Sequence, residues 1–471
     1  MIGRKKEIQL FQDLIKKDES SFVAIYGRRR VGKTYLVRES FNNRFTFSHA
    51  GLADANKSEQ LQAFGVSLVE AGMELKSEPK NWIEAFALLR ELVKSSNEQK
   101  KVIFIDELSW MDTRGSNLIS ALENFWNGWA SGRKDVVLIV CASATSWMLN
   151  KVIHNKGGLY NRLTAQIHLQ QFTLGECREY LVAQNVAMNN YQILQLYMIL
   201  GGVPYYWSLI KKGLGVPKNV DSLFFCENAL LADEFRYLYA AIFKNPTDYI
   251  KIIETLASKN SGMSREEIAQ MSGLPNSGNL TDKLDELISS GFVRRYYFYG
   301  KKKKDATYQL VDLFTIFYFR FLTSKSGDEN FWSNQINTPT VNAWEGVAFE
   351  MVCLLHVNQI KKKLGISGVL TECYSFHCKA NPDKGLFGSQ VDLLIERRDQ
   401  VINLCEMKFS ESEYNISEKF VMDLRKKISD FRNYTGTKYA IYSTLVSTYG
   451  VVDNSYSYEI QSIVKAEDLF E

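Results

Sequence analysis

Residues 22–34 read FVAIYGRRRVGKT, and this stretch decides the fold of the N-terminal part of the chain. Its first five residues are apolar or aromatic, which is typical of a buried strand. Gly27 to Thr34 then fits the pattern G-x-x-x-x-G-K-[ST], in which glycines let backbone amides turn toward phosphate groups. The positive end of the following helix adds to the attraction. The sequence therefore predicts a phosphate-binding loop between a strand and a helix.

The side chains of this loop have separate predicted roles. Lys33 would reach the β- and γ-phosphates of a nucleotide, and the Thr34 hydroxyl would be a ligand of Mg²⁺. The loop residues expected to contact the nucleotide are Gly27, Arg28, Arg29, Arg30, Val31, Gly32, Lys33, Thr34 and Tyr35.

Two more apolar runs, at 102–105 and 136–140, alternate with helical patterns, as expected for a parallel sheet covered on both faces. The helical patterns lie at 5–17, 58–72, 81–95 and 116–130. Asp106 and Glu107 follow the first of these runs. Because the carboxyl ends of parallel strands meet at one edge, both carboxylates are expected beside the phosphate loop. Asp106 would hold Mg²⁺, and Glu107 would polarise the attacking water.

The run at 136–140 ends in Cys141-Ala142-Ser143-Ala144-Thr145. A polar side chain here could sense the γ-phosphate, and we expect Ser143 rather than Thr145 to do so. Arg162 follows a glycine-containing turn, where a cation could stabilise charge in the transition state. A surface arginine is the alternative.

The middle of the chain changes character. A helical region from 173 to 240 is followed by three predicted helices, at 250–256, from Ser264 onward and at 279–288. Two strands at 292–299 and 307–311 complete the pattern, which is typical of a winged helix. Its hairpin carries six cations that could contact DNA phosphates or could simply be solvated; they are Arg294, Arg295, Lys301, Lys302, Lys303 and Lys304.

The C-terminal part carries a second group of charged residues. After a helix at 342–363, Asp392 lies on a predicted strand at 390–396, and Glu406 and Lys408 share one face of the next strand, at 401–409. A helix at 416–433 and a strand at 438–443 follow. Asp392 and Glu406 could bind Mg²⁺ with Glu350 or Glu345, and Lys408 could help activate water for phosphodiester cleavage. This pattern resembles the PD-(D/E)XK nuclease core, and the alternative is a binding module on the same scaffold.

The composition of the chain narrows the classes of protein to which it can belong. The formal net charge of +4 over 471 residues gives no indication of nucleic acid, and seven scattered cysteines suit a reducing compartment. The N-terminus lacks an apolar signal core, and no run of eighteen apolar residues occurs. We therefore expect a cytoplasmic protein without a membrane partner.

Taken together, these motifs resemble a prokaryotic AAA-type ATPase family related to the STAND signalling ATPases. The segments that carry the resemblance are Gly3-Arg4 with Glu7, the loop, Asp106-Glu107, 141–148, Tyr160-Asn161-Arg162, 201–204, 308–312 and 317–321. The resemblance implies ATP as the nucleotide, a place for Arg4 near the adenine and an arginine role for Arg162. It also implies an α/β fold with four parts, namely a P-loop ATPase domain (1–170), a helical lid (171–245), a winged helix with its connector (246–335) and a restriction-nuclease-like α/β domain (336–471). Cys141 departs from the glycine that such strands often carry.

The resemblance implies an ATPase coupled to a DNA-binding, possibly DNA-cleaving, C-terminal domain. Two alternatives stay open: a nucleotide-gated regulator that cuts nothing, and a scaffold that binds ATP and barely hydrolyses it. A homo-oligomer is compatible with each of them.

Overall fold

The computed structural model describes residues 2–243, 245–301, 305–323 and 327–471. The chain divides into two compact units, Met1–Gln171 with Ile242–Lys244, and Phe172–Ala241 with Asn245–Glu471. The α/β fold predicted from the sequence is confirmed. Within the described ranges, no helix combines the length and the apolar character needed to cross a bilayer.

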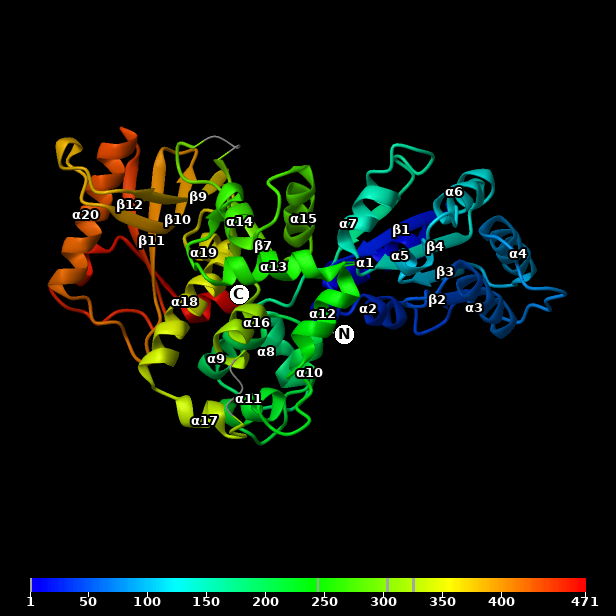
Figure 1. Ribbon diagram of the computed structural model, residues 1–471, viewed down its shortest axis with the longest axis horizontal. Coiled ribbons are helices and arrows are strands. Elements are labelled where there is room, and N and C mark those ends of the chain that lie inside the picture. Colours follow the sequence, from blue (N-terminus) through cyan, green and yellow to red (C-terminus); the bar gives the residue numbers. More distant parts are fainter. Residues whose placement is uncertain (1, 244, 302–304, 324–326) are drawn as a thin grey trace. The chain divides into compact units, whose positions relative to one another are not determined.

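A five-stranded sheet in the order β2-β3-β4-β1-β5 forms the centre of the first unit (Figure 1), and all its neighbouring strands are parallel. The strands are β1 (Ser21–Tyr26), β2 (Phe47–Ala50), β3 (Lys101–Asp106), β4 (Val136–Ala142) and β5 (Ala165–His168). The sequence predicted β1, β3 and β4. It missed β2 and β5 because these edge strands are four residues long and contain no continuous apolar run.

Helices cover both faces of this sheet. They are α1 (Lys5–Lys16), α2 (Lys33–Ser40), α3 (Lys57–Glu70), α4 (Trp82–Ser95), α5 (Leu108–Met111), α6 (Leu118–Gly128) and α7 (Thr145–Met148). On one face, Phe11 of α1 and Leu36 of α2 pack against β1, β3 and β4. On the other, Phe64 and Phe86 belong to the cluster that α3, α4 and α6 make with the same strands. Burial on both faces explains why β1 and β4 read as unbroken apolar runs.

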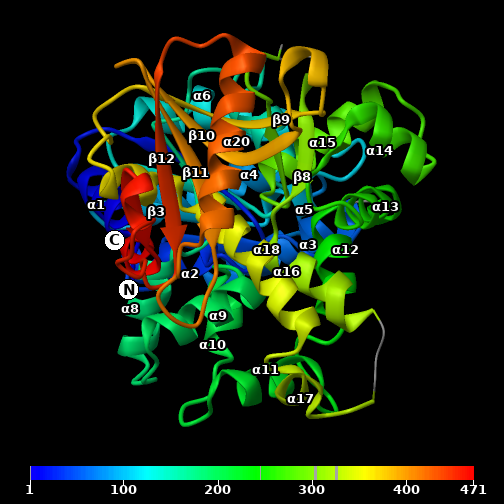
Figure 2. The same ribbon diagram turned by 90° about the vertical axis from the view of Figure 1, so that its left-hand side faces the viewer.

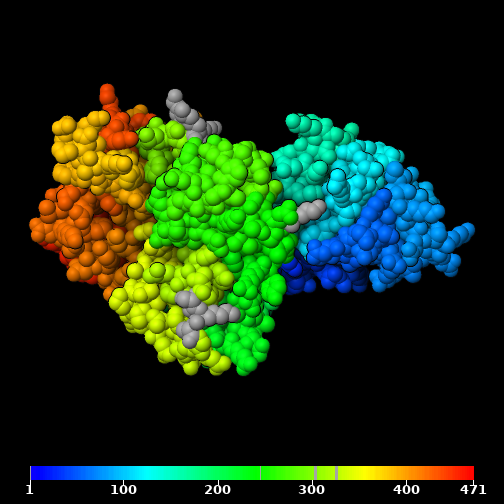
Figure 3. All heavy atoms as spheres, viewed as in Figure 1, coloured from blue at the N-terminus to red at the C-terminus, as the bar shows by residue number. Residues whose placement is uncertain are grey.

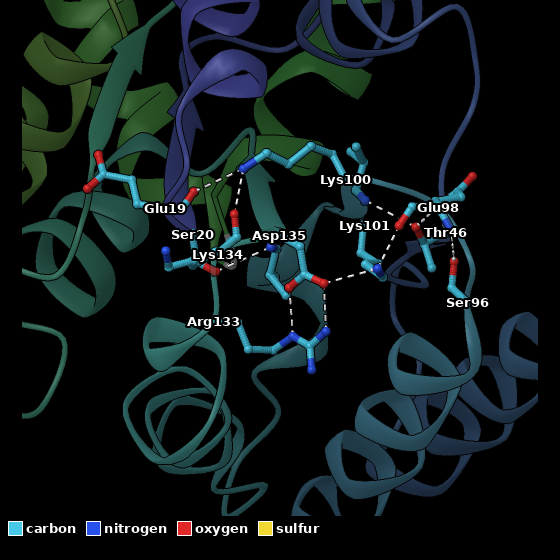
Figure 4. A network of polar contacts seen from close by, with 12 residues as sticks. Glu19, Ser20, Thr46, Ser96, Glu98, Lys100, Lys101, Arg133, Lys134 and Asp135 are labelled. Carbon is cyan, nitrogen blue, oxygen red and sulfur yellow. Dashed lines mark hydrogen bonds and ion pairs between the residues drawn. The ribbon is translucent and has the colours of Figure 1, made fainter.

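An ion-pair network lies at the amino-terminal edge of the sheet, where β3 and β4 begin (Figure 4). Asp135 accepts two hydrogen bonds from Arg133, at 2.7 and 2.6 Å, and its Oδ2 lies 3.0 Å from Lys101 Nζ. Lys100 Nζ donates to the carbonyls of Lys17 and Lys134 at 2.5 and 2.6 Å. These contacts bind together the chain segments that enter the sheet.

The second unit begins with the helices α8 (Leu174–Ala183), α9 (Asn190–Leu200), α10 (Pro204–Ser208) and α11 (Val216–Phe224), and α12 (Glu234–Ile242) follows them. His356 is buried and its Nε2 accepts the amide of Leu174 at 3.1 Å, which ties the first of these helices to the C-terminal part. Gly202 lies so close to the backbone that a Cβ there would be 1.9 Å from the carbonyl oxygen of Phe172.

Three helices and a three-stranded antiparallel sheet come next in the second unit. They are α13 (Pro246–Ala257), β6 (Met263–Ser264), α14 (Arg265–Ser272), α15 (Gly278–Ser289), β7 (Val293–Tyr296) and β8 (Thr307–Leu310), with strand order β6-β8-β7. Ser264 caps α14 in a capping box with Glu267, as its spacing predicts. The strand predicted at 292–299 ends earlier, at Tyr296.

The C-terminal domain contains a sheet in the order β13-β12-β11-β10-β9. Its elements are α18 (Pro339–Leu355), α19 (Val357–Lys363), β9 (Thr371–Cys378), β10 (Ser389–Arg397), β11 (Val401–Lys408), α20 (Glu418–Thr435), β12 (Ala440–Ser447) and β13 (Ser462–Lys465), and α16 (Leu313–Phe317) and α17 (Phe331–Gln335) lead into it. Figure 2 shows α20 in front of the sheet, where Val421 and Phe431 join the core formed with β9, β10 and β11. The helix predicted at 342–363 is two helices, divided at His356.

Candidate nucleotide site and C-terminal acidic site

Two glycines shape the loop that follows β1. Gly27 has φ 143° and Gly32 has φ 90°, conformations that favour glycine. A Cβ on Gly27 would also lie 2.3 Å from the carbonyl oxygen of Leu169, so no larger residue fits there. Helix α2 begins directly after Gly32. The strand–loop–helix order on which the motif depends is therefore present.

Lys33 connects the loop to the end of β4. Its Nζ donates to the carbonyls of Gly27 and Arg28 at 2.8 and 3.1 Å and to Ser143 Oγ at 3.0 Å. Lys33 is 5% exposed, and this burial lowers the pKa of its ammonium group, while the nearby Glu107 acts in the opposite direction. The ammonium group thus lies where the loop and β4 meet.

The carboxylates of Asp106, the last residue of β3, and of Glu107, which follows it, face the same place. Thr34 Oγ1 donates to Asp106 Oδ2 at 2.5 Å, so the two predicted Mg²⁺ ligands are in contact. Glu107 accepts hydrogen bonds from the Ser143 amide at 3.0 Å and from its hydroxyl at 2.5 Å. These residues meet because β3, β4 and β1 are neighbours in the sheet and end at one edge. By contrast, Thr145 is fully buried, and its hydroxyl has no hydrogen-bond partner in the structure described here.

Other predicted residues lie around this centre. Arg28 and Val31 are buried, Arg29 and Arg30 are partly buried, and Tyr35 is 58% exposed. Arg4 donates to the Gln170 carbonyl at 2.6 Å.

Arg162 is exposed, and its side chain makes no hydrogen bond or ion pair with a described residue. The structure thus gathers Lys33, Thr34, Asp106, Glu107 and Ser143, and does not bring Arg162 into contact with them.

The second predicted site lies on β10 and β11. These strands are antiparallel with Leu393 opposite Cys405, so Asp392 and Glu406 occupy the next facing positions. Glu406 is largely buried and accepts a hydrogen bond from Lys427 Nζ of α20 at 2.5 Å. Asp392 accepts one from Gln390 at 2.8 Å. No motif or spacing marks Lys427, which is one of many charged residues on its helix.

Glu350 of α18 shares this environment. Burial raises its pKa to about 7, and the negative charge of Asp392 adds to the effect while Lys408 opposes it. Glu350, Asp392, Glu406 and Lys408 are therefore electrostatic neighbours. In the described ranges, however, no three or more His, Cys, Asp or Glu side chains are grouped closely enough to hold a metal ion.

Glu345, the other helix carboxylate considered, lies elsewhere. Burial raises its pKa to about 7, Gln195 opposes this shift through a hydrogen bond, and the charge that adds to it comes from Glu411. Of the two helix carboxylates, Glu350 is therefore the neighbour of Asp392, Glu406 and Lys408, and Glu345 is not.

Two of the six cations expected on the hairpin make contacts within the chain. Arg294 Nε donates to Gln309 Oε1 at 2.6 Å, and its guanidinium lies 4.6 Å from the centre of the Tyr296 ring. Arg295 Nη1 lies 3.1 Å from Asp285 Oδ1. Lys301 is exposed, and Lys302 to Lys304 lie outside the described residues. The two arginines thus make intramolecular contacts.

Comparisons with known proteins show what the N-terminal part of the chain is similar to. Residues 1–210 match the family model of an ATPase domain found predominantly in Archaea. An uncharacterised protein of Methanocaldococcus jannaschii is 26% identical over 378 residues, which are 77% of this chain and 79% of that protein.

Among solved structures, a Walker-type ATPase of Pyrococcus abyssi aligns at 16% identity and a TM-score of 0.48, over 68% of this chain and 96% of that one. The Aeropyrum pernix ORC2 protein aligns at 13% identity and a TM-score of 0.43, over 76% and 95%. The N-terminal part of this chain is thus similar to an ATPase domain, and the phosphate loop with Lys33, Thr34 and Asp106 lies within the matched residues.

Proposed function

We propose that the chain couples ATP hydrolysis in its N-terminal domain to a C-terminal domain that binds DNA and cleaves it with Mg²⁺. The single observation that supports the second half is the strand pairing that brings Asp392 of β10 next to Glu406 of β11, with Lys408 two residues further along β11. The domain boundaries proposed are those expected from the sequence: 1–170, 171–245, 246–335 and 336–471. Helices α13 to α15 followed by β7 and β8 support a winged helix in the third part.

In the ATPase domain, Lys33 is proposed to exchange its loop carbonyls for the β- and γ-phosphates. Thr34 and Asp106 have the oxygen donors that Mg²⁺ prefers. Because these two side chains are hydrogen-bonded to each other, both oxygens are close enough to bind the same ion. Bound Mg²⁺ would neutralise charge on the phosphates. Glu107 would orient the attacking water, and Ser143 would hold the Glu107 carboxylate through its amide and hydroxyl. Arg162, being exposed, is proposed to act only if nucleotide binding or a second copy of the chain brings it to the phosphates.

Glu107→Gln tests the ATPase assignment. Losing the carboxylate should reduce ATP turnover by roughly 100-fold or more while ATP binding is retained, since water orientation acts on the chemical step. Glu91→Gln, an exposed glutamate on α4, is the matched control and should turn over at the original rate. Equal rates in both variants would instead support the scaffold that binds ATP and barely hydrolyses it.

In the C-terminal domain, the two strand carboxylates supply the hard oxygen ligands that Mg²⁺ requires. Bound there, Mg²⁺ would polarise a phosphodiester and favour an attacking hydroxide. Lys408, two residues after Glu406 on β11, is proposed to hold that water or the developing negative charge. Lys427 now holds the Glu406 carboxylate, so metal binding would require Lys427 to release one oxygen.

The test of this half is DNA cleavage with Mg²⁺ or Mn²⁺, with and without ATP. The double variant Glu406→Ala/Lys408→Ala should lose cleavage completely. The matched control is Glu418→Ala/Lys419→Ala, an exposed pair at the start of α20, which should cleave normally. Cleavage that survives in the first variant would come from another site or a contaminant, and the assignment would fail.

A nucleotide-gated regulator without nuclease activity is the second candidate. The ion pair of Lys427 with Glu406 favours it, because a carboxylate neutralised by lysine is a poorer metal ligand. Calorimetric titration with Mn²⁺ separates the two functions: binding lost in Asp392→Asn supports the nuclease, whereas no binding at all supports the regulator.

ATP-dependent coupling is the remaining element of the proposal, and it rests on the domain order. Proteolysis near residues 240–330 should change when ATP replaces ADP. An identical cleavage pattern in both states would count against coupling.

A further inference from the structure

A cavity of about 1010 Å³ lies within the second unit, between the β7–β8 hairpin and the edge of the C-terminal sheet. Its lining includes Arg294, Tyr296 and Phe298 from the hairpin side and His377, Gln390 and Asp392 from β9 and β10. Figure 3 shows the surface around residues 250–300 (green) beside that of the C-terminal domain (yellow to orange). The cavity thus connects the basic hairpin to a carboxylate of the proposed nuclease site.

Backbone pairing holds the two walls together. After Tyr296 the chain leaves its own hairpin, and Phe298 forms a parallel bridge with Ser375 of β9. Tyr299 N donates to the Ser375 carbonyl at 2.9 Å, and Ser375 N donates to the Tyr297 carbonyl at 3.2 Å. Because one segment pairs with both sheets in turn, the cavity walls form a single hydrogen-bonded scaffold.

The lining combines a cation with aromatic rings. Arg294 uses Nε for Gln309 and lies over the Tyr296 ring, and the charge of Asp392 partly offsets the lowering of its pKa by burial. The Tyr296 and Phe298 rings are 5.5 Å apart, and the His377 ring is 6.3 Å from Phe298. An arginine for phosphate beside rings for bases is the combination by which proteins hold unpaired nucleotides.

The lining contains both acids and cations. The acids are Glu266, Glu267, Asp305 and Asp392, and the cations are Lys259, Arg265, Arg294, Arg295 and Lys301. Glu267 of α14 is paired with Lys259, whose Nζ lies 2.8 Å from its carboxylate. Arg265 also lines the cavity and donates to Thr281 at 3.1 Å.

The volume of the cavity and its aromatic lining favour single-stranded over duplex nucleic acid. Ligand pockets commonly hold about 300–1,000 Å³, so this cavity has room for a few nucleotides at most. In a duplex the base faces are stacked on one another and are hidden from protein rings, whereas an unpaired strand exposes them. Tyr296 and Phe298 can therefore stack only on unpaired bases.

We propose that this cavity binds single-stranded DNA, with a phosphate at Arg294 and bases at Tyr296 and Phe298, and leads the strand to Asp392. The inference rests on the proposed DNA-cleaving function and specifies its substrate. An unpaired strand end or a gap, rather than an intact duplex, would enter the C-terminal site.

The test measures binding without cleavage. Fluorescein-labelled oligonucleotides of about 12 nucleotides are titrated with the full chain in EDTA and followed by anisotropy, as single-stranded DNA, as RNA of the same sequence and as a blunt duplex. Arg294→Met and Phe298→Leu should each weaken single-strand binding by roughly 5- to 100-fold. The controls are Arg398→Met and Phe387→Leu, both exposed on the C-terminal domain and outside the cavity, and they should bind normally.

A second measurement uses the unaltered protein, in case a variant misfolds. Single-stranded DNA carrying 5-iododeoxyuridine is irradiated, and the crosslinked peptide is identified by mass spectrometry. Crosslinks at Tyr296 or Phe298 support the proposal, and crosslinks confined to other aromatic residues overturn it.

The remaining outcomes separate this inference from the proposed function. Duplex or RNA bound as tightly as single-stranded DNA would refute the substrate class, even if cleavage occurs. Cleavage that is lost in Glu406→Ala but unchanged in Phe298→Leu would leave the nuclease intact and refute the cavity. Cavity-dependent binding without cleavage would retain the cavity and remove the nuclease.

Discussion

Asp135 offers a quantitative test of how the first unit is held together at the start of its sheet. The two hydrogen bonds from Arg133 lower its pKa from the ordinary 3.8 to about 2; burial opposes the shift, and Lys101 adds to it. A shift of that size corresponds to about 2 kcal/mol, at about 1.4 kcal/mol for each pKa unit. Asp135→Asn should therefore lower the free energy of unfolding of the first unit by about 2 kcal/mol at pH 7.

The sign of the pH dependence follows from the direction of the shift. A carboxyl group whose pKa is lowered by folding stabilises the folded state above its unfolded pKa, and this stabilisation disappears as the pH falls through the folded value. The cost of Asp135→Asn should therefore stay constant from pH 8 to pH 5 and shrink only below about pH 4.

Hydrogen exchange followed by mass spectrometry is the suitable assay, because peptides from β1 and β4 report on the first unit alone. The predicted loss corresponds to exchange that is roughly 30-fold faster in those peptides. Asp18→Asn is the control: Asp18 pairs with Lys134 at 2.9 Å in the same region, but the pair is solvent-exposed and should leave exchange unchanged. Equal effects of the two substitutions, or a cost that vanishes already at pH 6, would refute the reasoning.

Three further predictions follow from single contacts. Ser143→Ala removes the hydroxyl that contacts both Lys33 and Glu107, and steady-state assays should show ATP turnover reduced by about 10- to 100-fold. Gly202→Ala places a Cβ 1.9 Å from a carbonyl oxygen and should cost more than about 2 kcal/mol in urea unfolding of the second unit, whereas Gly368→Ala, in open space, should be neutral. Burial raises the pKa of Glu350 from 4.5 to about 7, so its ionisation opposes folding increasingly between these two pH values and by a constant amount above pH 7. Glu350→Gln should therefore add up to about 3 kcal/mol to the free energy of unfolding at pH 9 and almost nothing at pH 4, as measured by the same unfolding assay.

Predictions from the sequence agree with the structure where a local residue pattern and the local fold have the same physical cause. The run from Phe22 to Tyr26 is apolar because both of its faces are covered, so the pattern predicts its burial directly. The capping box at Ser264 predicts a helix start for an equally local reason. The edge strand β5 is different, because its four residues form a strand only by pairing with β1.

The same distinction applies to the candidate sites. Lys33 and Thr34 are adjacent in a motif, and parallel strand ends explain why Asp106 joins them. Lys427 reaches Glu406 only through the packing of α20, and no spacing in the sequence predicts it. The hairpin shows the limit most clearly, since Tyr297 to Tyr299 leave the predicted strand to pair with β9, about 75 residues further along the chain.

The hydrogen bond between Leu174 and His356 has a consequence for how the protein is made. These two residues are 182 positions apart, whereas all five strands of the first sheet lie between residues 21 and 168. At a synthesis rate of about 5–20 residues per second, roughly 10 to 40 seconds separate the appearance of Leu174 from that of its partner. The first unit can therefore close while the ribosome is still working, whereas the surface of α9 that packs against α18 stays uncovered until α18 has been made.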